Sequence, residues 1–231
     1  MKTAVFGGTG FVGGYLVDAL LDAGHAPSLL VRPGSENKVN QPGRCECVSG
    51  DLYDPSAISQ TLNGCDAAIY NVGLLREFPR KRITFEEMHH KAAVRVMDEM
   101  RASGIQRLLL MSAAGIHDKG TPYQVTKLAA ERYALESGLD VTIFRPSVIF
   151  GDPRGTMEFA TQLHQQMVRP PVPAVRFIAN GKDVMMSPVH IEDVASAFVR
   201  ALPDAATYGK TFELGGPEAL AWGEMIRRIA A

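Results

Sequence analysis

The feature that most constrains this chain is a glycine-rich turn that directly follows an apolar N-terminal segment. Gly8, Gly10 and Gly13 have the spacing G-x-G-x-x-G, Gly7 precedes them, and residues 15–23 have the pattern of a helix. Between a strand and a helix, missing side chains permit a tight turn, close approach of a pyrophosphate and close packing of the helix. Free N–H groups at the start of the helix also favour an anion. The turn therefore predicts dinucleotide binding, and the alternative is a tight turn that holds no ligand.

Strand-like and helix-like segments alternate through the rest of the chain. We expect strands at 26–31, 45–49, 66–70, 106–111 and 140–144, with helices at 55–62, 83–102 and 122–137. This alternation predicts an α/β fold with a doubly wound parallel (Rossmann) sheet and helices on both faces, because crossovers between parallel strands are right-handed. Ligands bind such sheets at the carboxyl ends of the strands.

The C-terminal third predicts a smaller unit beside that sheet. We expect a dinucleotide-binding domain over 1–151 and a small substrate-binding lobe over 152–231, interleaved with the main domain. Within the lobe the pattern predicts a helix over 159–167, a stiff connector at 169–173, strands at 175–178 and within 210–217, and a helix over 222–229.

Single residues of the lobe carry further expectations. Asp193 is expected in the first turn of a helix, where negative charge is favoured. His190 is expected either to pack or to contact a substrate. Four methionines are expected to fill gaps in the core rather than to line an apolar substrate site: Met157, Met167, Met185 and Met186.

Charge and composition exclude several classes of function. The chain has 24 basic and 25 acidic residues, so no charge surplus attracts nucleic acid or an anionic membrane. No apolar run approaches the ~20 residues that span a bilayer, and the N-terminus shows no signal-peptide pattern. Three cysteines and six histidines lack the spacing of a disulfide framework or a zinc site, and His89 and His90 are expected on the surface. We therefore expect a cytoplasmic protein with no nucleic-acid partner, no membrane insertion and no metal.

The ends of the following strands carry candidate cofactor contacts. Arg32 follows the second strand, where a carboxylate would accept the ribose 2′-hydroxyl of NAD. A guanidinium there suits the 2′-phosphate of NADP, so we expect NADP rather than NAD, the alternative being a solvated loop arginine. Asp51 and Leu52 end the third strand. We expect either that both residues contact the adenine of the cofactor or that Asp51 caps the turn that follows. The fourth strand ends in a stretch that leaves room for the cofactor: Asn71, Val72 and Gly73.

The helix expected over 122–137 carries a pair of residues with a chemical use. Tyr123 and Lys127 are four positions apart and lie on one face of that helix, which Thr121 caps and Pro122 opens. A free tyrosine has a pKa near ~10, and an adjacent ammonium favours the phenolate and lowers that pKa. Tyr123 can then exchange a proton with a substrate hydroxyl or carbonyl while a nicotinamide exchanges hydride. Ser112 ends the preceding strand and can bind the same substrate oxygen.

Together these motifs resemble the short-chain dehydrogenase/reductase superfamily in its extended or atypical form, the NAD(P)-dependent epimerase/dehydratase type. The resemblance rests on residues 7–13, 50–52, Ser112, the Tyr123/Lys127 pair and residues 145–151, and it covers nearly the whole chain. Within the superfamily, the chain is similar to the subgroup that includes the accessory Rossmann subunit of respiratory complex I.

The resemblance implies a role for each matching residue. Tyr123 would be the acid/base, Lys127 would hold the nicotinamide ribose and tune Tyr123, and Ser112 would polarise the substrate oxygen. It also implies cofactor contacts from the following residues: Gly7, Thr9, Gly10, Phe11, Val12, Gly13, Pro146 and Val148.

Two functions follow as hypotheses. The first is an NAD(P)-dependent oxidoreductase or epimerase/dehydratase that acts on a small hydroxyl or carbonyl compound, nucleotide-sugar-like compounds included. The alternative is a non-catalytic NAD(P)-binding sensor or an accessory subunit of a larger complex. The Tyr123/Lys127 pair favours the enzyme, because nucleotide binding alone does not need it. Proteins of this type usually continue beyond the last helix seen here, so we expect a substrate pocket that is open or is completed by another subunit, in a homodimer or with a partner.

Overall fold

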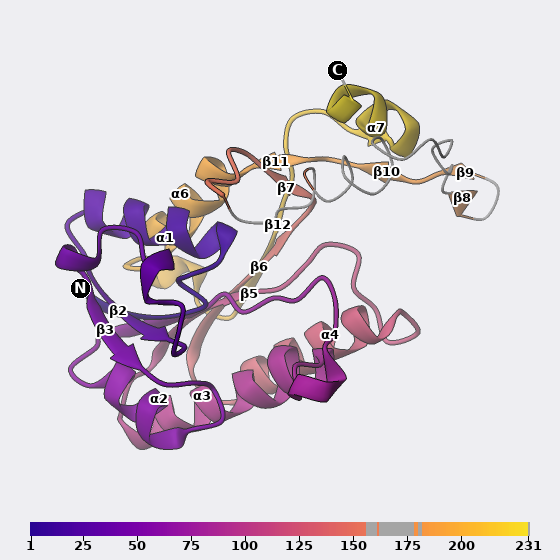
Figure 1. Ribbon diagram of the computed structural model, residues 1–231. Helices are drawn as coiled ribbons and strands as arrows, with labels where there is room; N and C mark the ends of the chain where they lie inside the picture. Colours follow the sequence, from indigo (N-terminus) through magenta and orange to yellow (C-terminus); the bar gives the residue numbers. More distant parts are fainter. Residues whose placement is uncertain (156–160, 162–177, 180–181, 231) are drawn as a thin grey trace.

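The computed structural model describes residues 1–155, 161, 178–179 and 182–230, and its centre is a seven-stranded parallel sheet (Figure 1). The spatial order of the strands is β12 (Lys210–Leu214), β6 (Asp140–Pro146), β5 (Arg107–Met111), β4 (Ala67–Tyr70), β1 (Lys2–Phe6), β2 (Ala26–Val31) and β3 (Glu46–Ser49). The chain starts in the middle at β1, runs out to β3 and returns to β4 on the other side of β1. The strand order therefore reverses between β1 and β4, the place where open sheets of this kind bind ligands.

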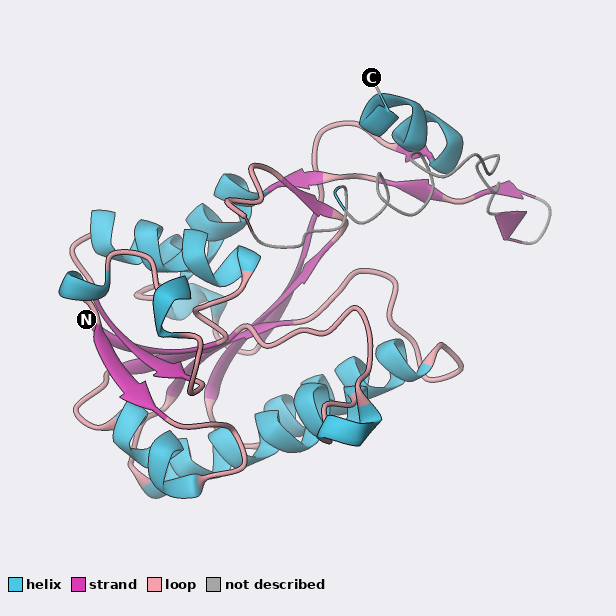
Figure 2. Cartoon of the chain, viewed as in Figure 1, coloured by secondary structure: helices cyan, strands magenta, loops and turns pink. Residues whose placement is uncertain are grey.

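Helices cover both faces of the sheet (Figure 2). On one face lie α1 (Phe11–Asp22) and α6 (Ile191–Ala201), and on the other lie α2 (Pro55–Leu62), α3 (Ala92–Ala102) and α4 (Pro122–Glu136). Side chains alternate along the central strand: Ala4 and Phe6 pack with the second group of helices, whereas Val5 packs with the first. Both layers are buried and apolar, and the predicted doubly wound α/β fold is confirmed.

The expected elements of the sheet and its helices are present, with some bounds shifted by a few residues. α1 begins at Phe11, earlier than expected, and its N-cap is Gly10, which has an extended backbone. The long helix expected after β4 begins as a π-helix, Glu86–Lys91, and continues as α3. At the start of α4, the predicted N-cap Thr121 forms a capping box with Gln124.

The C-terminal part adds short strand pairs and one helix beyond the sheet (Figure 1). β7 (Ile149–Phe150) pairs with β11 (Val189–His190), β10 (Met185–Met186) with β13 (Leu220–Ala221), and β8 (Ile178–Ala179) with β9 (Lys182–Asp183). α7 (Trp222–Ala230) packs its Trp222, Met225 and Ile226 with Leu220 in a small separate core. The helix expected over 159–167 and the connector at 169–173 lie, apart from residue 161, outside the described residues, and only residue 178 of the strand expected at 175–178 is described.

Among the residues that the structure describes, short turns of 3₁₀ helix occur in four loops: Glu36–Lys38, Pro42–Arg44, Pro79–Lys81 and Ala205–Thr207. An antiparallel bridge between Phe78 and Ile83 closes the loop that leads from β4 to the π-helix. Across the described ranges, no helix has the length and apolar character needed to cross a membrane.

Candidate functional site

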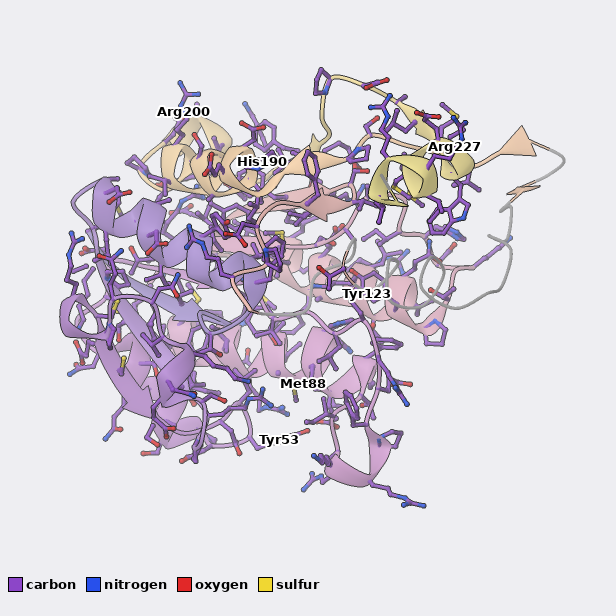
Figure 3. All side chains as sticks on the ribbon, turned by 45° about the horizontal axis from the view of Figure 1, so that its top comes forward. Tyr53, Met88, Tyr123, His190, Arg200 and Arg227 are labelled. Atoms are coloured by element: carbon purple, nitrogen blue, oxygen red, sulfur yellow. The ribbon has the colours of Figure 1, made fainter. Side chains whose placement is uncertain are left out.

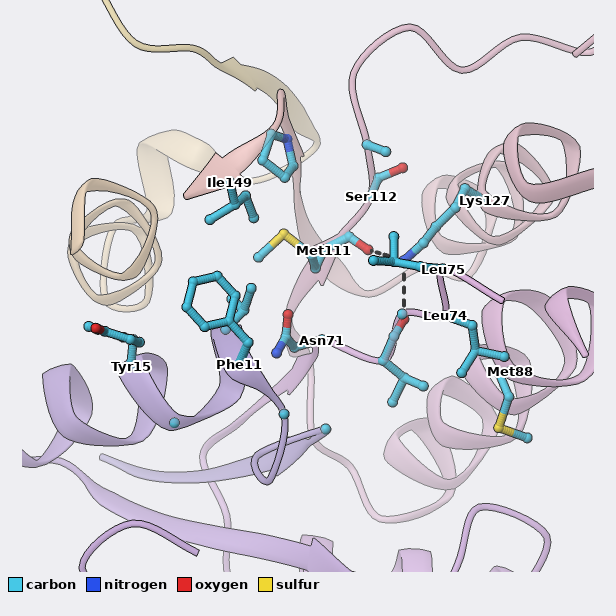
Figure 4. A pocket seen from close by; sticks show the side chains of 18 of the residues that line it. Phe11, Tyr15, Asn71, Leu74, Leu75, Met88, Met111, Ser112, Lys127 and Ile149 are labelled. Atoms are coloured by element: carbon cyan, nitrogen blue, oxygen red, sulfur yellow. Dashed lines mark hydrogen bonds between the residues drawn. The ribbon is translucent and has the colours of Figure 1, made fainter. Parts of the chain in front are cut away.

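A cleft of about 1560 Å³ lies at the carboxyl ends of the strands, across the point where the strand order reverses (Figure 4). Its walls come from the glycine turn, the ends of β2, β4 and β5, the first turns of α4, and the segments around β7 and β10. The residues expected to contact cofactor or substrate line this cleft, with three exceptions: Gly8 and Gly13 of the glycine turn, and His190, for which packing was the alternative. The fold therefore gathers into one cavity residues that are far apart in the sequence.

Three glycines of the turn have three different physical roles. Gly7 has a φ of +98°, and a Cβ there would lie 3.0 Å from the carbonyl of Asn71, so the turn needs glycine. At Gly13 a Cβ would lie 2.1 Å from the Gly7 oxygen, because α1 packs directly on the turn. At Gly10, among the described residues other than its chain neighbours, the only atom within 4 Å of a Cβ is the Gly7 oxygen, at 3.6 Å. Gly10 therefore leaves open space toward the cleft, as a bound pyrophosphate requires.

The first glycine of the functional spacing is Gly7 rather than Gly8. The G-x-G-x-x-G pattern begins at Gly8, but Gly8 is buried and its missing side chain makes room for Leu29 on β2. The positive φ at Gly7 is a property of the tertiary turn, which the spacing alone does not reveal. Because no side chain caps α1, its first N–H groups stay free for a ligand, and the residues present fit a dinucleotide.

The adenosine end of the cleft is polar and carries positive charge. Arg32 lies exposed at the end of β2, and the loop after it adds Ser35, Asn37 and Lys38 to the lining. Sequence reasoning missed these three residues, although a polar loop directly after Arg32 is a readable signal. Asp51 lines the cleft and also accepts a hydrogen bond from the Tyr53 N–H at 2.7 Å, so its turn-forming role is present in the fold.

At the other end of the cleft, the buried ammonium of Lys127 joins the ends of two strands. Its Nζ donates to the carbonyl oxygens of Val72, at 3.1 Å, and Met111, at 3.0 Å, as the dashed lines in Figure 4 show. Burial lowers the pKa of Lys127 to about 8, and the charge of Glu131 opposes this shift only in part. Lys127 is thus held in place before any ligand binds.

The pKa of Tyr123 moves in the direction opposite to the expected one. The helix does place Tyr123 and Lys127 in the same cleft, but burial raises the pKa of the phenol above its ordinary value. The lowering expected from Lys127 fails because the ammonium is directed at two backbone carbonyls. The Tyr123 ring instead packs edge-to-face against Phe85 and His89, at centroid distances of 5.7 and 5.1 Å.

Ser112 presents an unused hydrogen-bonding group to this end of the cleft. The residue is 4% exposed, and its N–H donates to the Phe144 carbonyl at 2.7 Å. Its Oγ is buried and has no hydrogen-bond partner among the described residues. A buried hydroxyl without a partner costs stability, so it marks a place where a ligand oxygen would be bound.

Several expectations for other residues need correction or are confirmed. His89, expected on the surface, is 1% exposed because the π-helix turns it inward. Met185, expected in the core, is 55% exposed and lines the cleft, which Met186 also lines. His190 lies at the N-terminus of α6, where it accepts a hydrogen bond from the Glu192 N–H, and it is not part of the cleft lining (Figure 3).

Asp193 lies in the first turn of α6, as predicted. Met157 and Met167 lie outside the described residues. Within the described ranges, no three His, Cys, Asp or Glu side chains gather closely enough to hold a metal ion.

Known proteins are similar in sequence to most of this chain. A family model described as NAD(P)H-binding matches residues 7–205. The mitochondrial NADH dehydrogenase (ubiquinone) 1 alpha subcomplex subunit 9 of Arabidopsis thaliana is 28% identical over 230 residues, 96% of this chain and 55% of that protein. The ceramide reductase of Caulobacter vibrioides is 30% identical over 196 residues, 85% of this chain and 59% of that protein. The chain thus spans little more than half the length of these relatives.

The fold is shared with solved structures as well. The crystal structure of the UDP-glucose 4-epimerase of Thermus thermophilus in complex with NAD has a TM-score of 0.76 at 19% identity, and the match covers 100% of this chain and 82% of the epimerase. The glycine turn, the strand order and the ligand-sized cleft agree with the family match. The chain belongs to the NAD(P)H-binding family, as the motifs predicted. Its sequence is similar to the NADH dehydrogenase subunit and to the ceramide reductase, and it shares its fold with the epimerase.

Proposed function

We propose that this protein is an NADP-dependent oxidoreductase that interconverts a hydroxyl and a carbonyl group on a small molecule. The observation that carries the proposal is the buried, unpartnered Oγ of Ser112 in the same cleft as Tyr123 and Lys127. Most buried side-chain hydroxyls are hydrogen-bonded within the fold. Thr3 also has an unpartnered hydroxyl among the described residues, but it does not line the cleft. A hydroxyl that lacks a partner beside a phenol and an ammonium instead suits a substrate oxygen.

The chain's own residues divide the work at that oxygen. Ser112 donates a hydrogen bond that holds the substrate oxygen, and Tyr123 exchanges a proton with it. Lys127, anchored by Val72 and Met111, supplies positive charge close to the site. The nicotinamide, when bound, supplies or accepts the hydride.

The raised pKa of Tyr123 favours reduction of the carbonyl. Because burial raises that pKa, the phenol stays protonated throughout the neutral range and is ready to donate. In the reduction direction the enzyme needs a proton donor at the substrate oxygen, and in the oxidation direction it needs a phenolate. We therefore infer that carbonyl reduction is the direction the protein supports best near neutral pH.

The choice of NADP rests on the adenosine end of the cleft. Arg32 ends β2 where NAD-specific sites place a carboxylate, and Lys38 adds a second positive charge to the lining. A guanidinium binds phosphate through paired, charge-assisted hydrogen bonds. Both residues support a 2′-phosphate on the cofactor.

The described lining of the substrate side supports an apolar carbonyl compound. Leu75 and Met185 line the cleft, and each is more than half exposed. Three further apolar residues belong to the lining: Met88, Val148 and Met186. The ceramide reductase of Caulobacter vibrioides, one of the relatives, is named for an apolar substrate. An apolar ketone fits this surface better than a charged nucleotide sugar does.

An assay with two probe substrates tests this proposal. Purified protein with NADPH should reduce methyl 3-oxodecanoate, measured as the loss of NADPH absorbance. With NADP⁺ or NAD⁺, the same protein should leave UDP-glucose unchanged. Tyr123→Phe should lower turnover by about 10²–10⁴-fold. NADPH affinity should stay the same, because the phenol is not needed to hold the nucleotide. Full turnover in Tyr123→Phe would remove the phenol from the mechanism.

A second candidate function is an accessory subunit that binds the nucleotide without turning it over. The homology to the NADH dehydrogenase subunit of Arabidopsis thaliana favours it. This candidate predicts NADPH that exchanges slowly with free nucleotide and is not oxidised by any carbonyl probe. Exchange measured with isotope-labelled NADPH separates the two, since a turning-over enzyme must release its product nucleotide.

A further inference from the structure

One buried residue beside Tyr123 has no part in the mechanism described above. The imidazole of His89 is 1% exposed and packs edge-to-face against the Tyr123 ring, at 5.1 Å and an interplanar angle of 87°. Its other ring contact is with Phe85, which stacks on it at 5.3 Å. His89 is therefore in direct contact with the proposed acid/base and is closed off from solvent.

The two ring nitrogens of His89 connect two different segments of the site. The N–H of Leu74, in the loop after β4, donates to Nε2 at 3.0 Å. Nε2 must then be the unprotonated nitrogen, so Nδ1 carries the proton and donates to Thr126 Oγ1 at 3.2 Å. The Thr126 hydroxyl in turn donates to the carbonyl of Pro122 at 2.8 Å, in the first turn of α4. The imidazole thus bridges the loop after β4 to the turn that carries Tyr123.

The charge state of His89 agrees with this bridge. Burial, with a contribution from the charge of Lys127, lowers the pKa of His89 to about 2. The ring is therefore neutral near neutral pH. A protonated ring would have to give up the hydrogen bond from the Leu74 N–H.

The local backbone explains why a histidine points into the site at this position. His89 lies in the π-helix Glu86–Lys91, a wider turn that is rare in proteins and frequent at functional sites. The hydroxyl of Tyr70, from the end of β4, donates to the Met88 carbonyl in the same turn. His90, the next residue, remains partly exposed and pairs with Glu86 instead.

We propose that His89 is a positioning residue, which aims the Tyr123 ring and couples the loop after β4 to the first turn of α4. The loop matters because Val72, two residues before Leu74, accepts one of the hydrogen bonds of Lys127. Through its two nitrogens and its ring face, His89 sets where the phenol and the ammonium lie relative to each other. This inference rests on the proposed function, since it assigns His89 a role in presenting Tyr123 to a substrate.

Three variants separate ring packing from hydrogen bonding. His89→Phe keeps an aromatic ring against Tyr123 but removes both hydrogen bonds. His89→Gln keeps an acceptor for the Leu74 N–H and removes the ring. His90→Gln is the matched control, because it changes the neighbouring histidine outside the site. Thermal unfolding and circular dichroism identify any variant that fails to fold. If His89→Phe does not fold, His89→Gln still tests the proposal.

The kinetic readout uses NADPH and methyl 3-oxodecanoate. We expect kcat to fall by about tenfold to a hundredfold in His89→Phe, since a displaced proton donor slows the chemical step. KM for NADPH should change little, His89→Gln should recover part of kcat, and His90→Gln should match the wild type. Wild-type kcat in a folded His89→Phe, or a loss confined to KM, would overturn the proposal.

Two further readouts need no turnover, so they separate this inference from the proposed function. Nitrogen-15 spectra of the histidine side chains should show His89 protonated on Nδ1, with no titration between pH 5 and 8. Ultraviolet titration of the tyrosines, with the curve of the Tyr123→Phe variant subtracted, gives the pKa of Tyr123 alone. This pKa should stay raised in His89→Phe, which keeps a ring against the phenol. It should be lower than in the wild type in His89→Gln, because water replaces the ring. If wild type and Tyr123→Phe are both inactive, the proposed function fails while these readouts still decide the role of His89. A ring protonated on Nε2, or a Tyr123 titration identical in every variant, would contradict the positioning role.

Discussion

Two glycines of the same turn should respond to alanine in opposite ways. Gly13→Ala should destabilise the fold, and Gly10→Ala should leave the fold intact and weaken NADPH binding. The difference comes from what a Cβ would meet: backbone atoms at 2.1 and 2.7 Å for Gly13, and only the Gly7 oxygen at 3.6 Å for Gly10. The pair therefore tests the roles assigned to the two glycines with chemically identical substitutions.

The cost at Gly13 follows from the displacement that a Cβ would force. Non-bonded carbon atoms prefer separations of about 3.5–4.0 Å, so α1 would have to move away from the turn by more than ~1 Å. Overpacking in a core costs about 1–3 kcal/mol where side chains can yield. Here the nearest atoms are backbone, so we expect a loss of unfolding free energy of about 3 kcal/mol or more. For a chain of this size, that loss lowers Tm by roughly 6–12 °C.

At Gly10 the balance is different. Its φ of −87° and ψ of 176° are open to alanine, and reduced freedom of the unfolded chain stabilises the variant by about 0.4–1 kcal/mol. Alanine is a poorer N-cap than glycine, which costs a similar amount, so the net change in stability should stay within about 1 kcal/mol. The added methyl group, however, would occupy the open space in which a bound pyrophosphate would lie. We expect NADPH affinity to fall at least tenfold, which is about 1.4 kcal/mol.

Urea unfolding and fluorescence titration with NADPH measure both quantities on each variant. Gly43→Ala is the matched control, because nothing lies within 4 Å of a Cβ there and the residue is not part of the cleft lining. It should change neither stability nor binding appreciably. If Gly13→Ala were as stable as wild type, or if Gly10→Ala bound NADPH normally, the assignment of the turn would be refuted.

Two further predictions concern the charged residues of the cleft. Arg32→Ala should weaken NADPH binding by about tenfold to a hundredfold, which is the contribution of charge-assisted hydrogen bonds, and should leave NADH binding unchanged. An equal loss of affinity for both nucleotides would contradict the assignment of Arg32 to the 2′-phosphate. Because the pKa of Lys127 is about 8, its ammonium is present below that pH and is lost above it. The kcat/KM for carbonyl reduction should therefore fall as pH rises through about 8, and Lys127→Met should be slow with no such fall. A wild-type profile that stays level well above pH 8 would argue against a role for this ammonium.

The parallel sheet, its helices and the cleft residues at the ends of the strands could be predicted from the sequence because they depend on local patterns. Alternating apolar segments specify strands and helices, and right-handed crossovers leave few ways to join them. The four-residue spacing of Tyr123 and Lys127 places them on one helical face wherever the helix lies. Once the sheet is known, the ends of its strands must meet, which brings Arg32, Asn71 and Ser112 to the same edge.

What only the tertiary structure decided are the properties that depend on contacts between distant segments. The tight turn belongs to Gly7 because Asn71, directly after β4, leaves no room for a side chain. The pKa of Tyr123 rises because surrounding segments bury it. The Lys127 ammonium is hydrogen-bonded to the carbonyls of Val72, in the loop after β4, and Met111, at the end of β5. His89 is buried because a π-helix, which no periodicity signalled, turns it toward the site. Burial and hydrogen-bond partners arise only when the whole chain is packed, and spacing along a sequence does not contain them.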